Sequence, residues 1–104
     1  MKKLVFLWVI IFVSCSSSKF DKVNGISFVS SREELSQDHI DPVLDIKANY
    51  AAIMPFGFIR DVDSPELIFD SEHQWYGERR EGVRQYIEGM HQNGVSVMLK
   101  PQIW

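Results

Sequence analysis

Cysteine is nearly absent from this chain, which has one, Cys15, among 104 residues. No disulfide can form within one chain, so the fold must depend on side-chain packing alone. Basic residues form no run and the formal net charge is −3 at pH 7, which argues against a nucleic-acid partner. The longest apolar run, Leu4 to Val13, is about half the roughly 20 residues that a membrane-spanning helix needs. These absences disfavour a disulfide scaffold, a nucleic-acid-binding protein and a bilayer span in this run.

Motifs for cofactors and metals are also missing. No Gly-x-Gly-x-x-Gly or Walker-type loop follows the first strand-like segment, which disfavours a nucleotide-binding sheet. The three histidines lie far apart and form no His-Glu-x-x-His pattern, so the sequence displays no zinc site. Acidic residues crowd the stretch 61–72, but it lacks the central glycine and final glutamate of an EF-hand, so a solvated acidic loop is favoured. We expect no cofactor and no metal.

The N-terminus has the pattern of an export signal. Lys2 and Lys3 precede the apolar run, as in a secretory signal peptide over residues 1–14. Small residues then precede the lone Cys15 and resemble the lipobox of bacterial lipoproteins, in which the cysteine carries the lipid. An ordinary cleaved signal with a chance cysteine is the alternative. We expect an exported protein of the bacterial cell envelope, anchored to the membrane through Cys15, with residues 15–24 as a polar tether.

The remaining residues alternate between strand and helix signals. We expect a strand at 25–30, a helix at 42–48 preceded by a helical turn, a strand at 51–59, a loop at 60–76, a helix at 78–93 and a strand at 95–104. Asp41-Pro42 suits a helix start, Asn93-Gly94 suits a helix stop, and Pro55 should end regular strand pairing near Met54. This β-α-β-α-β order predicts an α/β fold with parallel strands and right-handed crossovers. Without a nucleotide-binding loop, a (β/α)8 barrel is preferred to a doubly wound sheet.

Three segments resemble the N-terminal part of barrel glycoside hydrolases of the β-mannanase type, close to glycoside hydrolase family 113. They are Asn24 to Phe28 (NGISF), Ala52 to Phe58 (AIMPFGF) and Gly94 to Pro101 (GVSVMLKP). The resemblance implies that residues 25–104 are the N-terminal part of a partial TIM barrel. It also implies a retaining hydrolase of β-1,4-linked, mannan-like polysaccharide, with catalytic glutamates ending strands four and seven. Those strands are not in this sequence, so we assign no catalytic residue and expect this chain alone to be inactive.

Polar and aromatic residues near the strand ends are the candidate substrate-binding residues. In barrels the substrate lies at the carboxyl ends of the strands, where the sequence places Arg60, Lys100, Gln102 and Trp104. Lysine and glutamine can donate hydrogen bonds to sugar hydroxyls, and an indole can cover the apolar face of a pyranose. Trp75, near the end of the long loop, is a further candidate platform, although loop aromatics more often pack onto a neighbouring helix. Structural bonds to neighbouring loops are the alternative for Lys100 and Gln102.

Two other functions fit the same residues. One is a non-catalytic lipoprotein of the same fold, which would bind glycan or a partner through the loop 60–76. The other is a complete small lipoprotein that pairs its open strand edges by oligomerising. All three hypotheses include a lipid anchor at Cys15. The partner is a polysaccharide in the first, a glycan or a protein in the second, and further copies of the chain in the third.

Overall fold

The structure, a computed structural model, describes residues 21–104. The predicted signal peptide, Cys15 and the first part of the tether therefore lie outside the described residues. Within 21–104, no helix has the length and apolar character that crossing a membrane would require.

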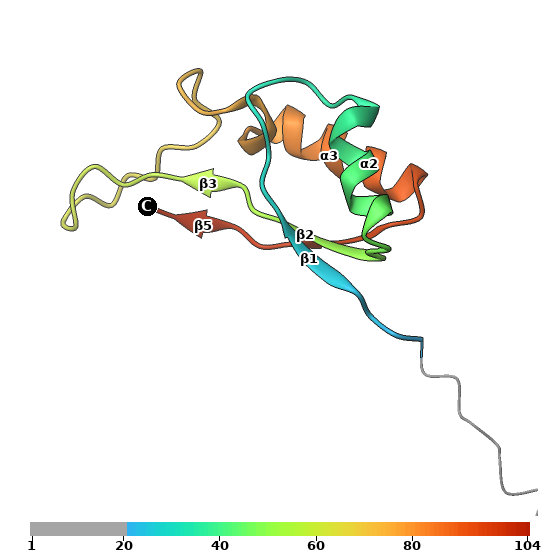
Figure 1. Ribbon diagram of the computed structural model, residues 1–104. Helices are drawn as coiled ribbons and strands as arrows, with labels where there is room; N and C mark the ends of the chain where they lie inside the picture. The colour runs from blue at the N-terminus through green and yellow to red at the C-terminus, as the bar shows by residue number, and fades with distance from the viewer. Residues whose placement is uncertain (1–20) are drawn as a thin grey trace, which may run out of the picture.

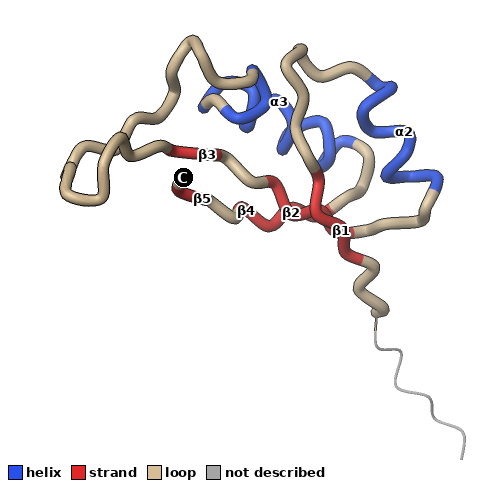
Figure 2. The backbone as a smooth tube through the Cα atoms, turned by 60° about the vertical axis from the view of Figure 1, so that its left-hand side comes forward, coloured by secondary structure: helices blue, strands red, loops and turns tan. Residues whose placement is uncertain are grey.

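Three parallel strands form the main sheet, with two helices over one of its faces (Figure 1). The strands are β1 (Gly25–Phe28), β2 (Tyr50–Ile53) and β4 (Ser96–Leu99), in the order β1-β2-β4. Each connection between neighbouring strands contains a helix, α2 (Gln37–Asp45) or α3 (Arg80–Gln92). Figure 2, from a second direction, again shows both helices on the same side of the strands. The predicted α/β class with parallel pairing is confirmed.

The core lies between the sheet and these helices. It contains residues from β2, α2 and α3: Ala51, Ile53, Ile40, Val43, Val83, Tyr86 and Met90 are all buried. The Tyr86 hydroxyl lies 2.9 Å from the Ser31 hydroxyl, so this buried polar group has a partner, as burial requires. Helix α3 thus contributes a stripe of buried apolar side chains to the core.

Helix α2 begins earlier than predicted. Its N-cap is Ser36, whose backbone N–H donates to Nδ1 of His39 at 3.0 Å. An early start brings Ile40 into the core beside Val43. Pro42 is therefore inside the helix rather than at its first position, and it is exposed there.

Helix α2 also ends before the predicted Ala48. Lys47 has a left-handed φ of 58°, and its N–H donates to the Leu44 carbonyl at 2.9 Å. The Ala48 N–H donates to the Val43 carbonyl at 3.2 Å. These two bonds are those of a Schellman motif, in which glycine usually holds the left-handed position. Helix α3 ends in the same way with Gly94 at φ 76°, which confirms the predicted stop.

Strand pairing resumes after Pro55, contrary to the prediction that regular pairing ends near Met54. Regular pairing of β2 does end at Ile53. A second parallel pair then forms between β3 (Phe56–Gly57) and β5 (Gln102–Ile103). The Gln102 N–H donates to the Pro55 carbonyl and the Trp104 N–H to the Gly57 carbonyl, both at 2.9 Å. Proline lacks only its own donor, so its carbonyl continues the ladder.

The long loop after β3 is partly ordered by backbone pairing. Phe58 and Ile68 form an antiparallel bridge, with each N–H donating to the other residue's carbonyl at 2.7 Å. Residues between them project from the body as a turn (Figure 1). The chain then returns to a short 3-10 helix, η1 (Tyr76–Glu78), in front of α3. This return positions the candidate site.

Candidate functional site

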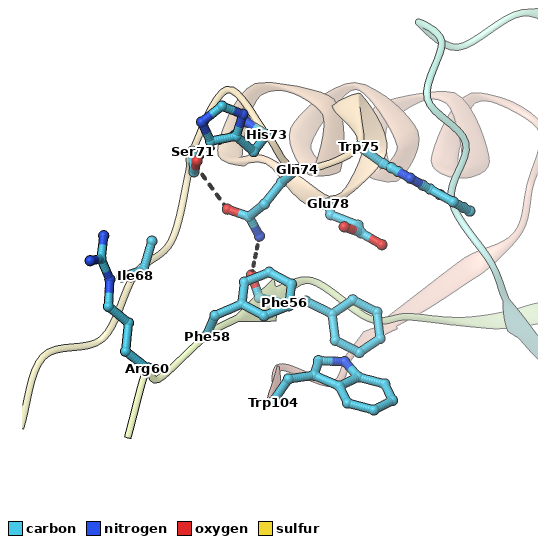
Figure 3. A pocket seen from close by; sticks show the side chains of 10 residues that line it. All are labelled: Phe56, Phe58, Arg60, Ile68, Ser71, His73, Gln74, Trp75, Glu78 and Trp104. Carbon is cyan, nitrogen blue, oxygen red and sulfur yellow. Dashed lines mark hydrogen bonds between the residues drawn. The ribbon is translucent and has the colours of Figure 1, made fainter. Parts of the chain in front are cut away.

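A hollow of about 620 Å³ opens where the β3–β5 pair meets the returning loop (Figure 3). We call it the aromatic hollow. It is lined by Phe56, Phe58, Arg60, Ile68, Ser71, His73, Gln74, Trp75, Glu78 and Trp104. It lies at the carboxyl ends of the parallel strands, the end at which α/β proteins usually bind ligands.

The floor of the hollow is aromatic. Trp104 follows β5 and Phe56 begins β3, and their ring centroids are 5.9 Å apart with a tilt of 37°. Backbone pairing holds the main chains that carry these rings side by side, because the Trp104 N–H donates to the Gly57 carbonyl on the neighbouring strand. Trp104 nevertheless remains 70% exposed. A large apolar surface is therefore both held in place and open to a ligand.

Gln74 joins the loop to the sheet, a role that no sequence pattern indicates. Its Nε2 donates to the Phe56 carbonyl at 2.6 Å, and its Oε1 accepts from the Ser71 N–H at 2.9 Å; Figure 3 shows both bonds. The residue is only 6% exposed. A glutamine inside a polar loop carries no pattern that distinguishes it from a solvated one. Its burial is visible only once the loop folds back on β3.

Arginine and aspartate side chains hold the end of the loop. Arg79 donates through Nε to the Gln74 carbonyl at 3.0 Å and through Nη2 to the Glu72 carbonyl at 2.7 Å. Asp70 accepts from the Arg80 N–H at 2.9 Å, at the first residue of α3. Such a carboxylate satisfies an amide that the helix itself leaves unpaired. The loop is thus attached to both the sheet and the helix.

Trp75 lies at the rim of the hollow and is 39% exposed. The Arg32 guanidinium lies 5.2 Å from the centroid of its ring, a cation-π arrangement. In Figure 3 the Glu78 carboxylate lies between Trp75 and the aromatic floor. Nearby, partial burial raises the pKa of the Tyr76 phenol, and the Glu34 carboxylate adds to this shift. Tyr76 is therefore a neutral hydroxyl at pH 7.

The structure brings together three of the five predicted binding residues. Arg60, Trp75 and Trp104 all line the aromatic hollow, whereas Lys100 and Gln102 do not. The Gln102 amide lies 3.7 Å from the Met54 sulfur, and Lys100 is exposed before β5 begins. Gln102 is the strand partner of Phe56, a lining residue, but its side chain reaches Met54 rather than the hollow. The acidic stretch 61–72 forms no metal cluster, and no group of three His, Cys, Asp or Glu within residues 21–104 is arranged to hold a metal ion.

Comparison of this chain with protein families, curated proteins and solved structures finds no match. The chemistry of the site must be argued from its geometry. The hollow offers aromatic faces, one carboxylate in Glu78, and donors in Arg60 and His73. Aromatic faces bind the apolar CH face of a sugar ring, and a carboxylate and N–H donors bind its hydroxyls.

Proposed function

We propose that the aromatic hollow binds a β-linked, mannan-like polysaccharide. The observation that carries the proposal is the exposed Trp104, held beside Phe56 by strand pairing. An aromatic side chain held in place loses little conformational freedom when a ligand stacks on it, so more of the contact energy appears as affinity. Glu78 and Arg60 on the same lining add hydrogen-bonding groups, and the three β-mannanase-like segments give the choice of glycan.

Hydrolysis of the same polysaccharide is the second candidate function. It is favoured by the resemblance, and the alternation of parallel strands and helices is compatible with a (β/α)8 barrel as with other α/β folds. Retaining hydrolysis needs two carboxyl groups about 5 to 5.5 Å apart. Among the residues lining the hollow, Glu78 is the single carboxylate. Binding is therefore the function that we assign to these residues, and the catalytic glutamates implied by the resemblance are assigned to no residue here.

The barrel assignment is likewise a proposal. Apolar side chains are exposed beside both outer strands of the sheet, Val29 after β1 and Leu99 in β4. In a barrel, further β/α units would cover both. We also propose that the signal segment and Cys15 place the hollow at the cell envelope. Mass spectrometry of the mature N-terminus checks this, because an unmodified Cys15 would contradict it.

Tryptophan fluorescence tests glycan binding at the site itself. The chain has three tryptophans, and in a Trp8→Phe background the two that remain, Trp75 and Trp104, both line the hollow. Titration with β-1,4-linked oligomannose should shift their emission. Trp104→Ala should weaken binding at least about tenfold, or about 1.4 kcal/mol, as measured by calorimetry.

Phe69→Ala is the matched control, because Phe69 is exposed but lies outside the lining of the aromatic hollow. Its affinity for oligomannose should equal that of the parent. Equal loss in both variants, or no binding by the parent, would contradict the proposal. Release of reducing ends from mannan by this chain would instead favour hydrolysis.

A further inference from the structure

A second, more polar hollow of about 400 Å³ adjoins the aromatic hollow. The two share three lining residues, His73, Gln74 and Trp75. The second hollow adds Arg32, Glu72, Tyr76 and Arg79, and we call it the arginine hollow. Two guanidinium groups and one carboxylate carry its charge at pH 7, so its lining is positive in a protein whose net charge is negative.

Arg79 is held in a fixed position in this hollow. Its Nε and Nη2 donate to the backbone carbonyls of Gln74 and Glu72. Its Nη1 donates to no other residue in the described part of the chain. Backbone carbonyls do not neutralise the guanidinium, so its full positive charge remains. A fixed arginine with free donors is well suited to bind an anion, because little freedom is lost on binding.

Arg32 reaches the same hollow from the segment between β1 and α2. Its guanidinium is positioned by the ring of Trp75 at 5.2 Å. Within residues 21–104 it makes no hydrogen bond or ion pair, whereas Arg84 is paired with Glu81. Arginine presents five N–H donors in a planar fork that matches the two oxygens of a carboxylate or sulfate. Two such groups thus line the same hollow.

We propose that the arginine hollow binds the acidic group of a sugar, a uronate carboxylate or a sulfate ester, while a neighbouring ring of the same chain occupies the aromatic hollow. This inference rests on the proposed glycan binding and narrows it to acidic glycans. Trp75 connects the two sites, because it lines both hollows and carries Arg32 on its ring. The Glu72 carboxylate on the same lining opposes the anion but leaves an excess of one positive charge.

The test compares two oligosaccharides that differ only at carbon six. β-1,4-linked oligomannose and β-1,4-linked oligomannuronate of equal length are titrated into the full chain with Trp8→Phe, and Trp75 and Trp104 emission is measured. At low salt the acidic ligand should bind about tenfold more tightly, and this preference should fall as ionic strength rises. Sulfated oligomannose in the same assay distinguishes a sulfate ester from a carboxylate.

Arg32→Gln should remove the preference and leave oligomannose affinity within about threefold. Arg32→Lys keeps the charge without the fork and should retain part of the preference. Arg80→Gln is the matched control, because it removes the same charge outside both hollows and should retain the full preference. Equal affinity for the neutral and both acidic ligands would overturn this inference and leave the proposed function standing. Binding of none of the ligands would overturn both.

Discussion

The two halves of the parallel ribbon formed by residues 50–59 and 96–104 differ in what their side chains contact. Before the prolines, β2 buries Ala51 and Ile53 beneath the helices. After the prolines, the β3–β5 pair continues the same backbone ladder but leaves Trp104 and Ile103 exposed. The same backbone hydrogen-bonding pattern therefore carries buried side chains in one half and solvent-exposed side chains in the other.

The first way to test this difference is to shorten the same side chain in each half. Ile53 is 1% exposed in β2 and Ile103 is 64% exposed in β5. Ile53→Ala should lower the free energy of unfolding by about 2 to 4 kcal/mol, because it leaves a cavity in the core. Ile103→Ala should change it by no more than about 0.5 kcal/mol. Urea denaturation followed by circular dichroism measures both, and equal losses would show that the second half is packed as a core.

A second test concerns the attachment of the loop to the β3–β5 pair. Gln74→Leu leaves the Phe56 carbonyl and the Ser71 N–H without their partners, which should cost about 1 to 3 kcal/mol. Because the loop carries Trp75, oligomannose affinity should fall as well. Gln92→Leu, at an exposed position of α3, should leave both properties unchanged. Normal affinity in Gln74→Leu would mean that the loop does not need this attachment to form the site.

A third and smaller effect is expected at the C-terminal ends of α2 and α3, the helices that cover β2. Lys47 holds the left-handed position that Gly94 holds in the other helix. Lys47→Gly should stabilise the protein by about 0.5 to 1 kcal/mol, because a residue with a side chain is strained at positive φ. Gly94→Ala should destabilise it by about 1 kcal/mol. Glycan affinity should stay constant in both variants, since neither residue lines a hollow.

The helices that pack on β2 were more predictable from sequence than the candidate site. The stripe of Val83, Tyr86 and Met90 and the stop at Gly94 depend on neighbours within a few residues, so local pattern specifies them. The sequence predicts a later start for helix α2, because Asp41-Pro42 is a strong local start signal. Burial of Ile40 and the Ser36 cap outweigh it in the folded protein.

The candidate site was less predictable, because it depends on contacts between distant residues. Strand-end position identified Arg60 and Trp104, and aromatic character identified Trp75. Gln74 was missed because its partner on β3, Phe56, is 18 residues away. Arg32 was missed because it comes from a different segment and meets Trp75 only in the folded chain.

Pro101 has a consequence for anything that adds to the outer side of β4. In the ribbon, the N–H groups of Lys100, Gln102 and Trp104 point inward to the neighbouring strand. Alternation turns those of Leu99 and Ile103 outward, and at Pro101 the outward donor is missing. A strand from another protein segment can therefore align with β4 up to Leu99 but meets a gap in the ladder immediately afterwards. The added strand is therefore expected to diverge from the ribbon before it reaches Trp104. A further strand can then pair with β4 without covering the Trp104 indole.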